Sequence, residues 1–432
     1  MGGGSVRIVR KIRHLVLGGG SGQLALLRRL KGLDRYVVLQ DRNPRCSGRS
    51  WADDFVRADT TDGEAAERSA RDYRVDAVLT AGTDQPVLAA ARAAAARGCP
   101  ALLDVETARA VTDKEAMKAR LAAAGLPTPR CRFGGPGGDA WDRHPLRGLE
   151  PPYVVKPVDS QGQRGVVRFR DPDAFEAYRD AALEWSRRGR WIVEEYHENR
   201  EVTVSGWVHG GRVETWAVTD RVTRDFAPHI GLCLAHRYPS TYAAGRQSEI
   251  EKLTGRCVQA LGIRSGPIYF QFLNTESGIL VNETAARLGG AYEDVSLPPV
   301  CGRDVLGLLI AAAERGTADP LDRDFRIPVS AGAFAVPLMF CRPGRISSLG
   351  PERRVRAVPG ITEFAYLQAP GTVIESPRNS VQRAAYMVVH GADIAEVNRI
   401  LRRAVARTAL YDRTGRQLLR NTLGYMRNYE AT

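Results

Sequence analysis

The sequence predicts an α/β protein with an α+β middle section, and three observations support this class. Strands and helices alternate over residues 13–105, apolar hairpins follow between residues 153 and 285, and short strands with a final helix end the chain. The alternation predicts a parallel sheet covered by helices. The hairpins predict antiparallel pairing in the middle section.

Apolar periodicity places the elements of the first section. It predicts strands at 15–17, 37–39 and 75–79, and helices at 24–30 and 86–97. Gly98 ends the last of these helices, because glycine readily adopts the left-handed conformation of a helix end.

The turn after the first strand resembles a dinucleotide-binding fingerprint. It has Gly18, Gly20 and Gly22, but Gln23 stands where the third glycine is expected. Asp41 ends the second strand, where such sites carry an acidic residue. A dehydrogenase therefore stays an alternative, on a partial motif.

The middle and last sections are predicted in the same way. Asp113 is expected to cap a helix that Gly125 ends, and Asp171 with Pro172 is expected to begin another. Strands are expected at 153–157, 166–170, 191–196, 201–208, 212–219, 267–274 and 279–283, and helices at 248–261 and 394–407. The chain from about residue 330 is expected to form a separate C-terminal module.

The bulk composition limits the class of protein. A chain of 432 residues is too long for one hydrophobic core, so roughly two to four domains are expected. The hydrophobic fraction of 44% is ordinary for a soluble protein, and no apolar run approaches the roughly 20 residues that cross a bilayer. The first residues lack the apolar segment of a signal peptide, so we expect a cytoplasmic protein without a membrane partner.

Charge and cysteine content narrow the partners. A net charge of +13 is compatible with nucleic-acid binding, but the basic residues are spread among acidic ones, so we expect no nucleic-acid partner. Anionic small substrates such as phosphates explain the excess better. The seven cysteines form no C-x-x-C pair, which argues against a disulfide framework or structural zinc and for a reducing compartment.

One apolar hairpin carries a candidate metal site. Its turn lies near Ser277, and folding its arms about that turn places Gln271 opposite Glu283. Paired residues have Cβ atoms roughly 4.5–5.5 Å apart, so an amide oxygen and a carboxylate converge. Mg²⁺ prefers such oxygen ligands. The alternatives are a buried Gln–Glu hydrogen bond and a surface salt bridge between Glu283 and Arg287.

Two other segments suit a nucleotide. The stretch DSQGQRG at 159–165 joins two strands as a flap whose small residues let backbone N–H groups approach phosphates. Lys156 precedes it on an apolar strand; a phosphate partner would explain its burial, and an edge-strand lysine facing water is the alternative. A strand that exits through Glu194 and Glu195 to Glu201 suits adenine and ribose, with solvated glutamates as the alternative.

In this order the segments resemble the ATP-grasp superfamily. The likeness is to its carboxylate–amine ligases and, more distantly, to biotin carboxylase and the large subunit of carbamoyl phosphate synthetase. It implies a pre-ATP-grasp Rossmann-like domain at 1–105 and a two-lobed ATP-grasp domain at 106–328, with the flap lobe at about 128–197. A small C-terminal α+β domain at 329–432 would follow.

The resemblance also assigns roles to residues. Lys114 and Lys156 would contact phosphates, and Gln271 and Glu283 would hold Mg²⁺, with Mn²⁺ as a substitute. Arg287, catalytic with Glu283, would hold the acyl phosphate and the oxyanion that follows. The other ATP-binding positions that it implies are Ser160, Gly162, Gly165, Val166, Glu194, Glu195, His197 and Glu201. The substrate positions are His236, Arg287, Gly289 and Gly290, the glycines letting the backbone approach the substrate.

Some positions depart from the family pattern. Relatives often read Glu-x-Asn-x-Arg, and here Ala285 stands where Asn would be a further metal ligand. The partner ligand, often Glu, is Gln271, so the number of bound Mg²⁺ ions stays open. Cys233 stands where a Glu often precedes His236, so we expect an acceptor different from the common ones.

The resemblance implies an ATP-dependent ligase. It would join a small-molecule carboxylate to an amine through an acyl phosphate and release ADP and phosphate. The alternatives are a carboxylase of the biotin-carboxylase type and a non-catalytic nucleotide-binding regulatory protein. The resemblance leaves a homodimer open.

Overall fold

The structure, a computed structural model, describes residues 10–136 and 144–420. It confirms the predicted α/β class, because a small parallel sheet lies beside a large antiparallel one. The ends of the first and last predicted domains, and residues 137–143 of the predicted flap lobe, lie outside the described residues. Among the described residues, no helix is long and apolar enough to cross a membrane.

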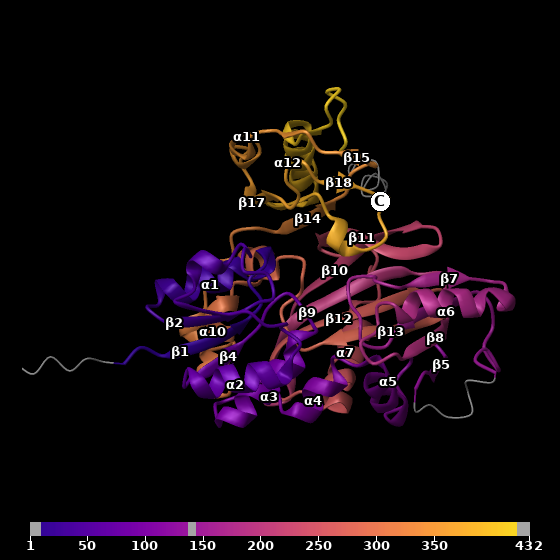
Figure 1. The fold of residues 1–432 in the computed structure, drawn as a ribbon, viewed down its shortest axis with the longest axis horizontal. Helices are drawn as coiled ribbons and strands as arrows, with labels where there is room; N and C mark the ends of the chain where they lie inside the picture. Colours follow the sequence, from indigo (N-terminus) through magenta and orange to yellow (C-terminus); the bar gives the residue numbers. More distant parts are fainter. Residues whose placement is uncertain (1–9, 137–143, 421–432) are drawn as a thin grey trace, which may run out of the picture.

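The first domain lies at the lower left of Figure 1. Its elements are β1 (Arg13–Leu17), η1 (Ser21–Gln23), α1 (Leu24–Gly32), β2 (Tyr36–Gln40), η2 (Arg49–Trp51), β3 (Asp54–Val56), α2 (Gly63–Asp72), β4 (Ala77–Leu79) and α3 (Pro86–Arg97). The strands form a parallel sheet in the order β3-β2-β1-β4, as the alternation predicts. The sequence prediction lacks β3 and α2, since β3 is a short half-buried strand and the buried face of α2 is mostly alanine.

Two helices lead from the first domain to the predicted flap lobe, α4 (Val105–Ala110) and α5 (Lys114–Ala123). The predicted flap lobe then holds β5 (Cys131–Gly134), β6 (Tyr153–Pro157), β7 (Val167–Phe169), η4 (Pro172–Ala174), α6 (Phe175–Leu183) and β8 (Trp191–Glu195). The predicted cap of α5 is confirmed, because the Asp113 carboxylate accepts the N–H groups of Glu115 and Ala116. This cap fixes where the helix begins and therefore where Lys114 lies.

The central part holds the long hairpins. Its elements are β9 (Arg200–His209), β10 (Arg212–Phe226), β11 (His229–Tyr238), α7 (Gln247–Leu261), β12 (Ser265–Thr275), β13 (Gly278–Ala285), α8 (Glu293–Ser296), α9 (Pro298–Cys301), α10 (Val305–Arg315) and η5 (Arg323–Phe325). These strands continue into the flap lobe in the order β13-β12-β9-β10-β11-β7-β6-β8-β5. The two predicted hairpins are confirmed, and β11 adds a third strand beside β10.

The C-terminal part continues the large sheet and also builds most of a hydrophobic cluster of its own. Its elements are β14 (Ala333–Met339), β15 (Gly344–Arg345), β16 (Ser348–Leu349), α11 (Glu352–Arg356), β17 (Ile361–Tyr366), β18 (Val373–Ile374), η6 (Ser380–Gln382), β19 (Ala385–Gly391), α12 (Ile394–Arg407) and β20 (Leu410–Tyr411). Strand β14 pairs with β11 on one side and β19 on the other, so the large sheet continues into this part. Strand β14 is buried along its whole length between these two neighbours.

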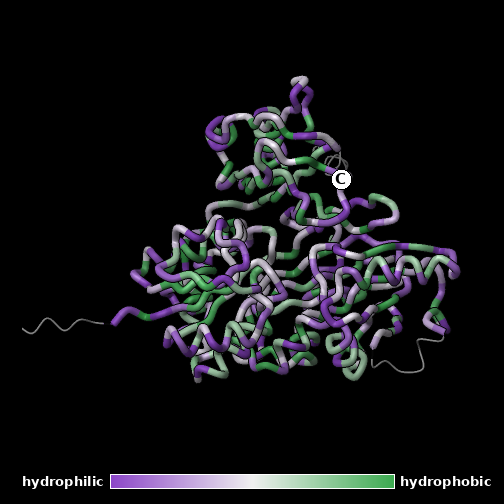
Figure 2. Tube along the Cα trace, in the orientation of Figure 1, coloured by the Kyte–Doolittle hydropathy of each residue, from purple (hydrophilic) through white to green (hydrophobic). Residues whose placement is uncertain are grey.

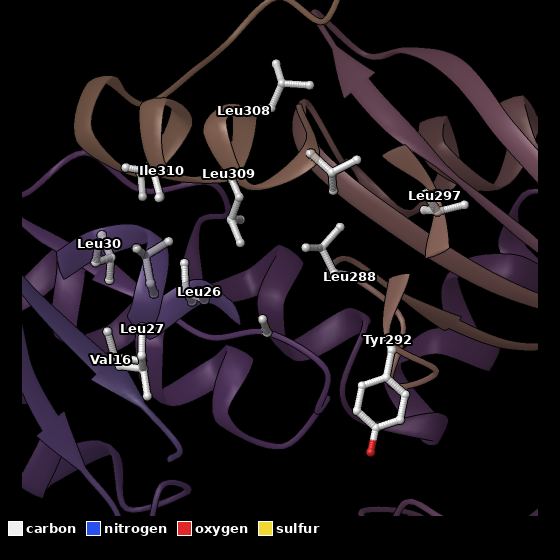
Figure 3. Close-up of a cluster of buried hydrophobic side chains, with 14 of the residues drawn as sticks. Val16, Leu26, Leu27, Leu30, Leu288, Tyr292, Leu297, Leu308, Leu309 and Ile310 are labelled. Atoms are coloured by element: carbon white, nitrogen blue, oxygen red, sulfur yellow. The ribbon is translucent and has the colours of Figure 1, made fainter. Parts of the chain in front are cut away.

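One hydrophobic core joins the first domain to the central part. Leu27 of α1 and Leu309 of α10 belong to one buried cluster with Leu288, which follows β13 (Figure 3). Helix α10, orange in Figure 1, lies among the indigo and violet elements of the first domain, against β4. Figure 2 shows hydrophobic segments gathered in the interior of this domain and hydrophilic ones at its edge. This shared core fixes the end of β13 against the turn that follows β4.

Candidate functional site

Two cavities meet at the β12–β13 hairpin. The first lies under the flap and gathers both predicted metal ligands and every predicted ATP-binding residue except Gly165. The second, of about 450 Å³, lies where the first domain, the hairpin and the C-terminal part converge. Gln271 and Glu283 line both cavities, so they stand on the wall that the two share.

The predicted pairing of Gln271 with Glu283 is confirmed. The two residues are direct partners across the antiparallel strands β12 and β13. The register shifts beside them, so that Asn282 is an extra residue on β13 and also lines the first cavity. Such bulges redirect side chains next to functional sites. The hairpin therefore presents a carboxylate and two amide groups to the cavity.

This donor set fits Mg²⁺ that arrives with a nucleotide. Within residues 10–136 and 144–420, no group of three His, Cys, Asp or Glu side chains is placed to hold a metal ion by itself. Mg²⁺ commonly takes one or two protein carboxylates together with phosphates and water. Glu283 with Gln271 or Asn282 can supply the protein share of such a shell.

Lysines surround the predicted metal ligands. The Lys114 ammonium lies 3.4 Å from the Glu283 carboxylate and donates to the carbonyl of Ser160 at 2.7 Å. Lys156 is buried on β6, but it is not unpaired, since the Glu194 carboxylate lies 2.5 Å from it. The sequence suggests that Lys156 needs a phosphate to compensate its burial. The structure corrects this expectation, because Glu194 already compensates the charge. The place of Lys156 on the cavity wall still allows a phosphate contact.

Glu194 is held by two lysines rather than exposed to an adenine ring. Lys118, one turn after Lys114 on α5, lies 2.7 Å from its carboxylate, opposite Lys156. Burial opposes ionisation of this carboxyl, but the two ammonium groups outweigh burial and lower the pKa of Glu194 to about 2. The group is therefore an anion that fixes both lysines at the cavity.

Glu283 is also ionised at neutral pH. Burial would raise its pKa, but Lys114, Lys156 and Arg287 outweigh burial and hold the pKa of this carboxyl below its ordinary value. An ionised carboxylate surrounded by three cationic side chains suits a site where a metal ion and phosphates bind together.

Some predicted flap residues line the first cavity, and one packs inside the protein. Ser160, Gly162 and Val166 line the first cavity. Gly165, with φ +68°, instead packs against α6, where an added Cβ would lie 3.1 Å from Ala182 and from Trp185. The C-terminal part reaches the flap as well, because the Ser380 amide donates to the carbonyl of Gly162 at 2.9 Å. The flap is thus held by a segment more than 200 residues away along the chain.

The exit of β8 lines the far side of the first cavity. The Glu195 carboxylate pairs with Arg130 and accepts the N–H of Glu150 at 2.8 Å. His197 lines the cavity. The Glu201 carboxylate lies 2.5 Å from the buried guanidinium of Arg221. Burial raises the pKa of Glu201 above its ordinary value. A ribose hydroxyl that binds at Glu201 would therefore lie beside the cation of Arg221.

Arg287 links two domains. Its Nε donates to Asp84 at 2.6 Å, a second guanidinium nitrogen contacts the same carboxylate, and Nη1 donates to the Leu288 carbonyl at 3.1 Å. One edge of the guanidinium fork is thus occupied by Asp84, which corrects the expectation that the whole fork is open to substrate. These bonds use three of its five N–H groups, and the others can bind a ligand in the second cavity.

The predicted substrate residues mostly meet in the second cavity. His236 and Gly290 line it with Arg287. Burial, with Arg221, Arg383 and Arg287 nearby, holds the pKa of His236 well below its ordinary value, so its ring is neutral. Gly289 instead faces Tyr269 and Glu293, where an added Cβ would lie within 2.6 Å of both. Packing inside the protein explains that glycine.

The glycine-rich turn of the first domain also lines the second cavity. Ser21 and Gly22 lie on its wall. Asp41 accepts the N–H of Gly19 at 2.9 Å, and Gln23 accepts the N–H of Gly20 at 3.0 Å. Asp41, the acidic residue that a dinucleotide-binding site would use, is thus hydrogen-bonded to the glycine-rich turn itself.

Sequence reasoning missed several residues of these cavities. The sequence could have indicated Lys118 as a cavity residue, because it lies four residues after Lys114 and therefore on the same helix face. The indication for Asp84 is weaker: it follows the carboxyl end of β4, and parallel sheets bind ligands at that end of their strands. Asn282 reaches the cavity through a bulge, and Arg383 through a loop of the C-terminal part, so local pattern points to neither.

The small parallel sheet beside a large antiparallel one is the fold of the ATP-grasp proteins that the chain resembles. The family model for the L-amino acid ligase C-terminal domain 2 matches residues 336–411.

Solved structures share this fold. The fold resembles the L-amino acid ligase from Bacillus licheniformis, with a TM-score of 0.75 and 17% identity over 94% of this chain and 100% of that one. It also resembles the phosphoribosylglycinamide synthetase from Anaerococcus prevotii, with a TM-score of 0.71 and 17% identity over the same shares of the two chains. At this identity the likeness shows the fold alone.

The curated relatives are matched in part. The chain is 26% identical to the uncharacterized protein y4rH of Sinorhizobium fredii, over 70% of this chain and 61% of that protein. It is 30% identical to the D-alanine–D-alanine ligase of Chelativorans sp. (strain BNC1), over 35% of this chain and 49% of that ligase. The chain thus spans less than two thirds of the length of either relative.

Proposed function

We propose that this protein is an ATP-dependent ligase that joins a carboxylate to an amine through an acyl phosphate and releases ADP and phosphate. The observation that carries the proposal is the shared wall of the two cavities. Gln271 and Glu283 line both, with Lys114 and Lys156 on one side and Arg287 on the other. Such a wall is where a terminal phosphate in the first cavity would meet a carboxylate in the second.

In the proposed first step the carboxylate oxygen attacks the γ-phosphorus of ATP. Lys114 and Lys156 would hold phosphate oxygens, and Glu194 keeps Lys156 in place and charged. Glu283 with Gln271 or Asn282 would hold Mg²⁺, which draws negative charge from the phosphates when it is bound. The residues contribute mainly by position and charge.

In the proposed second step the amine attacks the acyl carbon and phosphate leaves. The free N–H groups of Arg287 would bind the oxyanion that forms, because Asp84 fixes the direction of the guanidinium. The neutral ring of His236 can accept a hydrogen bond from the amine. The ligase names of the matched C-terminal domain and of the D-alanine–D-alanine ligase support this chemistry.

A phosphate-release screen tests the proposal. Purified protein with MgATP is tested against pairs of amino acids and other acids with amines. We expect release of phosphate that needs both members of a pair, together with an equal amount of ADP and of the coupled product. Phosphate release that is independent of every acid and amine would contradict the ligase function.

A further inference from the structure

Arg383 is a cation of the second cavity that the proposed reaction leaves unused. It lies between η6 and β19 in the C-terminal part and lines the second cavity with its neighbour Gln368. The amide of Gln368 donates to the Arg383 carbonyl at 3.0 Å, which fixes the backbone at this point. Arg383 therefore reaches the cavity from the C-terminal part, whereas Arg287 follows β13.

The guanidinium of Arg383 differs from the other arginines of this cavity in its partners. Arg221 is paired with Glu201, and Arg287 is paired with Asp84. Arg164 lies over the ring of Trp185 at 5.7 Å. Across the part of the chain that the structure describes, no carboxylate lies at ion-pair distance from Arg383, and its buried Nε has no hydrogen-bond partner.

A half-buried guanidinium without an ion-pair partner destabilises the folded protein, because a charge removed from water needs a compensating anion. Burial lowers the pKa of Arg383 below its usual value, which shows the same lack of compensation. The cavity beside it, of about 450 Å³, is large enough for a small organic anion. Carboxylates are suited to this group, because they accept two parallel N–H bonds from arginine.

We propose that Arg383 binds a second carboxylate on one of the substrates, one that does not react; this rests on the ligase function proposed above. Arg383 lines the second cavity, whereas the proposed phosphate-binding residues Lys114 and Lys156 line the first. A carboxylate is therefore a better ligand for Arg383 than a phosphate of the nucleotide. The reacting carboxyl belongs near Glu283 and Arg287. The anion at Arg383 is then either the amine substrate's own carboxylate or an additional carboxylate of the acid substrate.

A binding measurement tests this without turnover. Thermal unfolding with saturating MgADP is followed with the proteinogenic amino acids and D-alanine, each against its primary amide. Aspartate and glutamate are also compared with asparagine and glutamine. The first comparison removes the α-carboxylate, which is the non-reacting group when the amino acid binds as the amine and the reacting group when it binds as the acid. The second removes only an additional carboxylate of the acid. An acid–amide difference counts for Arg383 only where Arg383→Gln changes it, so the two sources are distinguished by which comparison loses its difference in that variant. Ligands that bind the folded state raise the unfolding temperature.

The variants are Arg383→Gln and Arg383→Lys, with Arg378→Gln as the matched control. Arg378 is exposed on the same connection and lies 3.9 Å from Glu375. We expect at least one carboxylated probe to stabilise the wild type more than its amide. Arg383→Gln should abolish that difference, Arg383→Lys should keep part of it, and Arg378→Gln should keep all of it. Arg383→Gln should also fold normally without ligand, since it removes an uncompensated charge.

Kinetics separate this inference from the proposed function. With a substrate pair that the wild type ligates, Arg383→Gln should raise KM for the carboxylated substrate by roughly 10- to 100-fold and leave KM for ATP unchanged. If the wild type ligates and shows a carboxylate preference that Arg383→Gln retains, the inference is wrong and the ligase function stands. Equal stabilisation by every acid and its amide would also overturn the inference. A wild type that consumes no ATP with any pair would instead contradict the ligase function.

Discussion

The guanidinium of Arg287 donates from Nε to the carboxylate of Asp84 over 2.6 Å and so joins the end of β13 to the turn after β4. The pair crosses from the central hairpin to the first domain. In the proposed reaction the first domain therefore helps to direct the arginine that would hold the transferred phosphoryl group, rather than serving only as a binding surface.

Asp84→Asn should lower kcat by roughly 10- to 100-fold, because an ionic hydrogen bond that orients Arg287 becomes a weaker neutral one. KM for ATP should change little, since the nucleotide is expected in the first cavity. Steady-state kinetics measure both. Asp34→Asn is the control, because Asp34 pairs with Lys11 at the surface of the same domain. Equal kcat in Asp84→Asn and wild type would remove Asp84 from the positioning of Arg287.

Lys156→Ala should abolish ATP turnover and leave the fold intact. The lysine lies on the wall of the first cavity, and Glu194 remains paired with Lys118 in the variant. Phosphate release measures turnover, and circular dichroism follows the fold. Lys252→Ala, at an exposed position on α7, is the control. Turnover at the wild-type rate in Lys156→Ala would mean that Lys156 is only a structural partner of Glu194.

Glu283→Gln should be nearly inactive, whereas Gln271→Glu should keep activity and need less Mg²⁺. The first change removes the carboxylate of the hairpin's oxygen set, and the second adds another beside it. Turnover is measured against Mg²⁺ concentration, with Glu276→Gln at the hairpin turn as the control. A Glu283→Gln variant with the wild-type Mg²⁺ response would reduce the pair to a structural hydrogen bond.

The sequence was sufficient for contacts that depend on local pattern. Alternation and one turn were enough to pair Gln271 with Glu283, and a capping residue was enough to begin α5 at Lys114. The partners of buried charges were not predictable in this way. Glu194 meets Lys156 across adjacent strands, and Asp84 meets Arg287 across domains, so both pairs depend on how distant segments pack.

Glu293 should make the protein less stable at alkaline pH. Burial is the largest influence on this carboxyl and raises its pKa from 4.5 to about 7. The folded state then binds the proton more tightly than the unfolded state. This contribution is full below about pH 4.5 and is lost as pH rises through about 7, at a cost of about 3 kcal/mol.

Glu293→Gln removes the titration, since an amide stays neutral at every pH. The free energy of unfolding of the wild type should therefore fall relative to Glu293→Gln between pH 5 and pH 8 by about 2–3 kcal/mol. Urea unfolding at several pH values measures this difference. Glu251→Gln, at an exposed position on α7, should follow the wild type. Parallel curves for wild type and Glu293→Gln would show that the carboxyl is ionised throughout this range.

The central claim is that the carboxylate attacks the γ-phosphorus of ATP, and the fate of a labelled oxygen tests it most directly. An acid substrate that carries ¹⁸O in its carboxyl group is ligated to the amine with MgATP, and the phosphorylated products are separated and analysed by mass spectrometry. Attack on the γ-phosphorus, followed by loss of phosphate to the amine, predicts ADP and inorganic phosphate that contains one ¹⁸O from the acid. Label in AMP, with pyrophosphate as the other product, would contradict the acyl phosphate and the role proposed for Arg287.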